Sequence, residues 1–248
     1  MEERTDPLLT EPGFIHRQFF PGRRFQGYMG IKSITNTGRL YWLGRYSERV
    51  YTSLKLFSSS YDTLIEQDNY KSVCKYLEIP DIYTDKEDFI SRYAFDPANP
   101  DSIYANLQRA YDNAIELREE IGSETLSFIQ MAIYEMNSAK LSAAPLLYFQ
   151  KITDAILAFW GCVDDQIDDE NTRNIIKIGK RVERLDLYAR LGKDRVSLLR
   201  EVNRLAGRIG RTDLIYREED VQELKDLMNV QEPDCSRIIW VAEHLVEC

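Results

Sequence analysis

Histidine is almost absent from this chain, whose 248 residues include only His16 and His244. This scarcity argues against histidine-rich metal sites and against a catalytic histidine. The four cysteines lie far apart, at positions 74, 162, 235 and 248, and form no Cys-x-x-Cys pair. Such spacing is typical of reduced thiols in a cytoplasm. No motif predicts a bound cofactor.

A long hydrophobic run is also lacking. The longest apolar run, Ala155–Val163, lies between Asp154 and Asp164 and is too short to span a bilayer. The acidic residues Glu2 and Glu3 are unlike a secretory signal. The 32 Lys+Arg against 41 Asp+Glu give a net charge of −9, which argues against binding to nucleic acid or to an anionic membrane. A composition of 44% hydrophobic and 29% charged residues therefore predicts a cytoplasmic protein with a single core.

Alternating strand patterns and glycine-rich phosphate loops are missing as well. No glycine lies between Arg45 and Ile121, and apolar residues recur at helical spacing. The sequence therefore predicts an all-α helical bundle. The expected helices cover about residues 32–66, 69–79, 86–93, 101–121, 124–141, 145–163, 171–192, 196–208, 218–230 and 235–246.

Proline and glycine are instead concentrated near the start of the chain. Residues 1–30 contain prolines at 7, 12 and 21 and glycines at 13, 22 and 27, which predicts an extended arm before a helical domain at 31–248. Between Phe14 and Phe25, aromatic residues are interspersed with arginines. Such a strip either wraps over its own domain or docks to a partner, because interface cores are enriched in these residue types.

An internal repeat is the most informative pattern. Residues 43–50, LGRYSERV, match residues 178–185, IGKRVERL, at an offset of 135 residues. Glycine inside a helix costs about 1 kcal/mol relative to alanine, so Gly44 and Gly179 indicate a close approach of helices. Glu48 and Glu183 follow one turn later on the same side. We therefore expect two long, pseudo-symmetric helices with Gly-x-x-x-Glu-Arg motifs to cross near their glycines.

The paired glutamates have two interpretations. In the first, they form reciprocal ion pairs across the crossing, Glu48 with Arg184 and Glu183 with Arg49, assisted by Arg45. In the second, they converge on a polar groove that shares a proton or holds a substrate amine or a metal. The candidate groove residues are Arg45, Tyr46, Glu48, Arg49, Arg181, Glu183 and Arg184.

Four segments in the same order resemble the alpha-E domain family. They are LYWLGRYSERV at 40–50, FDPANPDSI at 95–103, FWGCVDDQIDDE at 159–170 and IGKRVERLDLYARL at 178–191. The resemblance covers roughly residue 29 to the end of the chain. It departs from the family at the arm and in the acidic segment at 164–170.

The resemblance implies an all-helical bacterial protein whose biochemistry is poorly defined. Members of the family are typically encoded beside, or fused to, circularly permuted ATP-grasp amide ligases. This association implies a helical component of a peptide-ligation or peptide-modification system, with an ATP-grasp ligase as partner and a peptide or acyl-peptide as substrate. Whether the chain itself is an enzyme does not follow from the association.

The acidic segment supports a different hypothesis. Asp164, Asp165 and Asp168 fit a DDxxD pattern, and several carboxylates in one place could hold Mg²⁺ for an independent metal-dependent enzyme. The simpler interpretation is an acidic loop that stabilises the start of the following helix. No second acidic motif is evident, and no ExxH motif supports a di-iron centre. A purely structural protein that forms homodimers is a third hypothesis.

Overall fold

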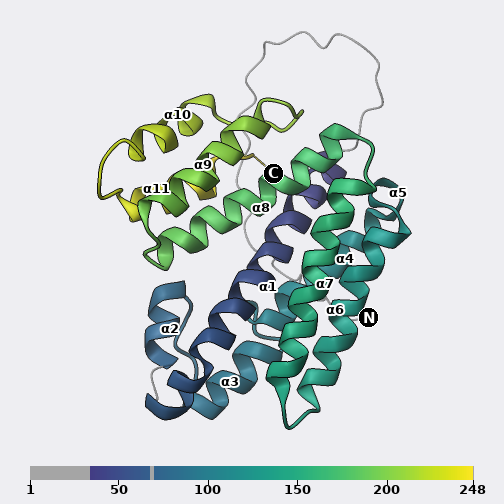
Figure 1. Cartoon of the computed structure of the whole chain (residues 1–248), viewed down its shortest axis with the longest axis vertical. Helices are drawn as coiled ribbons and strands as arrows, with labels where there is room; N and C mark the ends of the chain where they lie inside the picture. Colours follow the sequence, from purple (N-terminus) through teal and green to yellow (C-terminus); the bar gives the residue numbers. More distant parts are fainter. Residues whose placement is uncertain (1–33, 68–69, 248) are drawn as a thin grey trace, which may run out of the picture. The chain divides into compact units, whose positions relative to one another are not determined.

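The computed structural model describes residues 34–67 and 70–247. Side chains are described at residues 35–60 and 70–247. The described residues form eleven α-helices and no strand, apart from an isolated bridge between Tyr216 and Val246 (Figure 1). The expectation of an all-α bundle is confirmed, whereas the arm at 1–30 lies outside the described residues. In chain order the helices are α1 (Ile34–Gln67), α2 (Tyr70–Leu77), α3 (Lys86–Phe95), α4 (Ile103–Glu116), α5 (Arg118–Ile121), α6 (Ser123–Lys140), α7 (Pro145–Asp165), α8 (Glu170–Arg190), α9 (Arg195–Ile209), α10 (Glu218–Leu227) and α11 (Cys235–His244).

Short polar side chains define where many of these helices begin. Ser102, Asp169, Asp194 and Asp234 each accept a hydrogen bond from the backbone N–H three residues later. These contacts satisfy donors that the first turn of a helix leaves unpaired. Asp169, the cap of α8, comes from the acidic segment, so this carboxylate has a structural role.

Two groups of helices pack against the long helices α1 and α8. Helices α4 and α7 pack against α1, and α6 runs beside α7 and also packs against α4 (Figure 1). Helices α9 and α11 pack on α8, and α10 packs on both of them. Helix α1 and helix α8 share the most extensive contact in the described chain. The α1–α8 crossing therefore joins the two groups.

The close approach of α1 and α8 requires glycine at two positions, Gly44 and Gly179. A Cβ atom placed on Gly44 would lie 2.0 Å from the carbonyl oxygen of Ile176, and one placed on Gly179 would lie 2.0 Å from the carbonyl oxygen of Tyr41. Neither side chain is possible without moving backbone. Tyr41 and Ile176 are themselves 135 residues apart, as the two glycines are. Each helix therefore offers the equivalent surface to the other, and the expected pseudo-symmetric crossing is confirmed.

Two helix boundaries differ from the expectation. The expected helix at 101–121 is broken at Leu117, whose ψ of 14° leaves the helical range while its side chain stays fully buried. After Leu117 the chain turns into the short α5, which ends at Gly122 with a φ of +79°. The acidic segment is also not wholly a loop, because α7 continues to Asp165.

Helix α7 is the single described helix that is long and apolar enough to cross a membrane by length and composition. It packs against α6 and α1 through a buried face that includes Phe149, Ile156 and Phe159. Core helices of globular proteins have the same composition. The packing accounts for the apolar character of α7.

Alanine at the crossing tests whether the glycines are packing contacts. We expect Gly44→Ala to lower the free energy of unfolding by about 3 kcal/mol, because the new methyl group meets backbone that cannot yield locally. Gly161→Ala in α7 is the matched control, since a Cβ there meets nothing within 4 Å. That control should leave stability unchanged or raise it by up to about 1 kcal/mol. Equal effects in urea denaturation would contradict the close crossing.

Candidate functional site

Both Glu-Arg motifs form the reciprocal ion pairs predicted from the sequence. Glu48 on α1 pairs with Arg184 on α8, and Glu183 on α8 pairs with Arg49 on α1. The two carboxylates are buried, with side-chain exposures of 0% and 1%. Because each acid contacts the arginine of the opposite motif, the pairs cross the α1–α8 seam twice.

The Glu48 half is a closed, bidentate pair. Arg184 donates from Nε to Oε1 of Glu48 at 2.6 Å and from Nη2 to Oε2 at 2.9 Å. Thr52 donates a further hydrogen bond to Oε1 at 2.9 Å. This geometry satisfies both carboxylate oxygens through one edge of the guanidinium, formed by Nε and Nη2.

The Glu183 half is organised differently. Two guanidiniums share this carboxylate: Arg45 donates from Nε to Oε2 at 2.7 Å, and Arg49 donates from Nε to Oε1. Arg45 corresponds in the repeat to Lys180, so Glu48 has no second guanidinium partner at the equivalent position. The sequence substitution of arginine for lysine thus makes the two halves chemically unequal.

The pKa values of Glu48 and Glu183 shift in opposite directions, as the different numbers of arginine partners lead one to expect. Burial raises the pKa of Glu48 above its usual value, against the charge of Arg184. Burial also opposes the ionisation of Glu183, but the charges of Arg45 and Arg49 outweigh it and lower the pKa. Lys180 lies 3.8 Å above the Trp160 ring, and burial among neighbouring cations lowers its pKa to about 7, although Glu48 opposes the shift.

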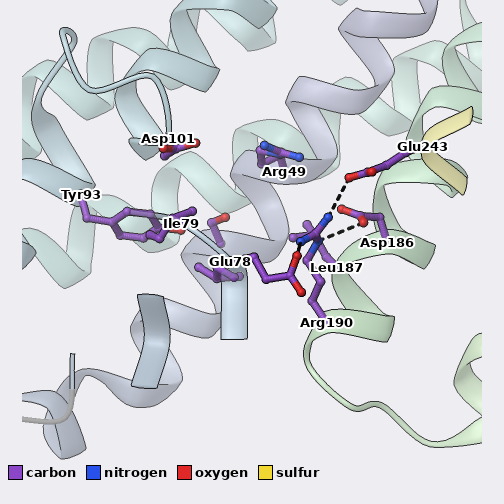
Figure 2. A pocket seen from close by; sticks show the side chains of 11 residues that line it. Arg49, Glu78, Ile79, Tyr93, Asp101, Asp186, Leu187, Arg190 and Glu243 are labelled. Carbon is purple, nitrogen blue, oxygen red and sulfur yellow. Dashed lines mark hydrogen bonds and ion pairs between the residues drawn. The ribbon is translucent and has the colours of Figure 1, made fainter. Parts of the chain in front are cut away.

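A second polar cluster extends along α8 from Glu183. Arg190 donates to Asp186 at 3.0 Å, to Glu243 of α11 at 2.8 Å, and to Glu78, which follows α2. Figure 2 shows the Arg190 guanidinium among these carboxylates, near Arg49. Oδ2 of Asp186 is buried without a hydrogen-bond partner among the described residues. Burial and the nearby charge of Glu183 raise the pKa of Asp186 to about 6, against the charge of Arg190.

Three adjoining cavities, here together called the α1 groove, lie beside this half of the crossing. Their volumes are about 590, 440 and 170 Å³. The first and second share Trp42, Tyr46 and Arg109 as lining, and the second and third share Arg49, Asp101 and Glu243. Since adjoining cavities have common walls, the groove follows α1 from Thr35 to Ser53, past α4 and α8.

Aromatic rings and guanidiniums form the wall of the middle cavity. Trp42 and Tyr46 stack with ring centroids 5.2 Å apart. The guanidinium carbon of Arg45 lies 4.9 Å from the Trp42 ring, and that of Arg109 lies 5.8 Å from the Tyr46 ring. This wall is apolar on its faces and cationic at its edges, which suits a ligand with both characters.

Four of the seven groove residues predicted from the sequence line the groove, and three do not. Arg45, Tyr46, Arg49 and Glu183 line the α1 groove. Arg181 does not, because its Nη1 donates to Glu201 of α9 at 2.7 Å. Glu48 and Arg184, the remaining two, form the closed pair on the other half of the crossing and do not line the groove either.

The acidic segment is dispersed rather than convergent. Asp164 lies at the end of α7 and pairs with Lys177 of α8, whereas Asp169 caps α8. Asp165 and Asp168 are exposed. No group of three His, Cys, Asp or Glu side chains in the described part of the chain could hold a metal ion. The geometry therefore gives no support to the DDxxD hypothesis.

Several residues that line the α1 groove lie outside the repeat, which therefore did not predict them. Asn106 and Arg109 come from α4, and Glu243 comes from α11. Asp186 and Arg190 follow the second motif at helical spacing, and this i, i+4 pattern could have indicated them. The contributions of α4 and α11 depend on tertiary packing alone.

Two long helices that cross at paired glycines and exchange buried Glu-Arg ion pairs define an all-α domain built on a duplicated motif. The chain belongs to the Alpha-E family, described as a predicted alpha-helical domain with a conserved ER motif, which matches residues 36–220. No curated protein and no solved structure matches the chain. The matched region includes both ER motifs, whereas α11, which supplies Glu243, lies beyond it.

Neutralising one buried glutamate should expose the energetic role of the crossed pairs. We expect Glu48→Gln to destabilise the fold by about 3 kcal/mol, because Arg184 loses its partner within the seam. Glu116→Gln is the matched control: Glu116 pairs with Arg39 at 3.4 Å on the surface and should contribute less than about 1 kcal/mol. Similar losses for both variants in chemical denaturation would refute a stabilising seam.

Asp186 should give stability a characteristic pH dependence. Its pKa of about 6 exceeds its usual 3.8, so the folded state binds more protons than the unfolded state between about pH 4 and 6. The contribution of Asp186 to stability therefore falls as pH rises through that range. Asp186→Asn should remove a change on the order of 3 kcal/mol from the pH profile of unfolding. Parallel profiles for the two proteins would show that Asp186 titrates normally.

Proposed function

We propose that this chain is a helical, non-ATP-binding component of an ATP-grasp-associated peptide-ligation or peptide-modification system. In this proposal it binds a peptide or acyl-peptide intermediate, or the ligase itself, through the α1 groove. The observation that carries the proposal is the groove, whose three adjoining cavities follow α1 beside the ER crossing. The association with an ATP-grasp ligase rests on the family resemblance.

The chemistry of the crossing favours binding over catalysis by the ER motifs. Both glutamates are buried and hydrogen-bonded to arginine, so neither carboxylate is available to accept a proton from a substrate. The paired motifs hold α1 against α8 and thereby fix one wall of the groove. The groove residues that remain accessible, including Trp42 and Arg109, have chemistry suited to recognition.

The shape of the groove favours an elongated ligand. Its cavities are open and arranged in series, with an apolar, aromatic stretch followed by a charged stretch. An extended peptide presents side chains and amides along its length and can contact each stretch in turn. A compact metabolite would occupy one cavity and leave the others without a role.

The proposal predicts association that depends on the groove. Co-expression with the ATP-grasp protein encoded by a neighbouring reading frame should yield a complex that survives affinity purification and gel filtration. Trp42→Ala combined with Arg109→Gln should weaken that complex about tenfold or more, because both side chains line two of the cavities. Lys55→Gln, in a separate cavity beside Tyr188, is the matched control.

Three results would count against the proposal. Absence of any complex would contradict the partnership with the ligase. A complex indifferent to the groove variants would place the partner on another surface. A stable homodimer that blocks the groove would favour the structural interpretation instead.

A further inference from the structure

The middle cavity of the α1 groove combines features that select one kind of chemical group. It has a volume of about 440 Å³ and is lined by three arginines: Arg45, Arg49 and Arg109. Its lining also includes the stacked Trp42 and Tyr46.

The arginines of the lining differ in how they are paired. Arg45 and Arg49 are both held by Glu183, which also lines the cavity. Arg109 forms no ion pair within the described chain, and its Nη1 donates to the carbonyl oxygen of Pro100 at 2.8 Å. A singly charged anion in the cavity would therefore pair with Arg109.

The donors that such an anion needs are present. Arg45 and Arg49 contact Glu183 through Nε, and their Nη groups make no hydrogen bond within the described chain. These Nη atoms are not among the buried atoms without partners, so they are accessible from the cavity. A guanidinium presents such groups in a planar fork that matches a carboxylate.

A buried acceptor stands beside these donors. Asn106 is 1% exposed, and its Nδ2 donates to the carbonyl oxygen of Ser102 at 2.8 Å. This arrangement leaves Oδ1 of Asn106 buried without a donor in the described residues, although Asn106 lines the cavity. A buried acceptor without a partner is costly, and an amide N–H from a ligand would satisfy it once the Asn106 side chain rotates toward the cavity.

The other half of the crossing provides an internal comparison. There Glu48 occupies both the Nε and the Nη2 of Arg184, and Lys180 replaces the second arginine. The surplus of guanidinium groups is thus confined to the Glu183 half. The Glu48 half thus combines one bidentate arginine with the charge of Lys180, whereas Arg45 and Arg49 also face the buried Asp186.

We infer that the middle cavity binds the free C-terminal carboxylate of a peptide, with Arg45, Arg49 and Arg109 facing the carboxylate, Asn106 accepting the terminal amide N–H, and Trp42 and Tyr46 contacting the last side chain. This inference rests on the proposed function and specifies the end of the peptide that the groove recognises. A carboxylate fits better than a phosphate, because it carries a single charge and, in a peptide, comes with an N–H group and an apolar side chain.

Isothermal titration of the full chain with two matched peptides tests the inference. The probes are N-acetylated Ala-Ala-Phe as the free acid and as the C-terminal amide, with inorganic phosphate as a competitor. We expect the acid to bind at least tenfold more tightly than the amide, because charged hydrogen bonds to guanidinium groups form only with the acid. Phosphate should compete weakly.

Variants separate carboxylate recognition from general damage to the groove. Arg109→Gln should reduce the preference for the acid to about threefold or less, while the melting temperature stays within a few degrees, since Arg109 takes no part in the Glu183 pair. Lys55→Gln should leave the preference intact. Trp42→Ala should weaken both peptides alike.

Equal affinity for the acid and the amide would overturn the inference. If Trp42→Ala still weakened both peptides, the proposed peptide-binding function would stand without recognition of the C-terminus. Failure of both peptides to bind, or stronger binding of phosphate than of the acid, would also overturn it. Association with the ATP-grasp protein is measured in a separate co-purification experiment. Failure of the inference can therefore be distinguished from failure of the proposed function.

Discussion

Helices that approach until a carbonyl oxygen of one lies against the Cα of the other must have glycine at the contact. Gly44 and Gly179 meet that requirement reciprocally, with Ile176 and Tyr41 as the opposing backbone. The remaining architecture depends on this approach, because α4 and α7 pack on one of the two helices, with α6 against both of them, and α9 and α11 pack on the other. Close contact at the glycines also brings the residues one turn further along within reach of the opposite helix.

The buried ion pairs give this contact a unique register. Removing two carboxylates from water is unfavourable, and their pairing offsets that cost only when the geometry is right. A slip of α1 along α8 by one turn would separate Glu48 from Arg184 and Glu183 from Arg49 at once. The pairs therefore contribute more to the specificity of the arrangement than to its net stability, and the groove acquires a rigid wall.

The repeat made the crossing, its glycines and its ion pairs predictable, because both helices encode their own side of the contact. The break at Leu117 was not predictable, since leucine has good helical propensity and its backbone nevertheless leaves the helical range. The α1 groove was predictable in part. Arg45 and Tyr46 lie within the motif, but Asn106 and Glu243 line the groove from α4 and α11. The periodicity of those two helices predicts which face is buried, but not which helix packs against it. Arg181 shows the converse: it lies within the second motif, yet its side chain contacts Glu201 of α9 and does not line the groove.

The separation of the two motifs in the chain has a kinetic consequence. Gly44 and Gly179 can meet only after the intervening 134 residues have become ordered or have closed a long loop. The α6–α7 pair, by contrast, is joined by a short connection and needs no distant partner to form. We therefore expect the hairpin of α6 and α7 to form early in folding, and the α1–α8 seam to close last. Substitutions at the seam would then accelerate unfolding far more than they slow folding, so the ER motifs would determine how long the native state persists.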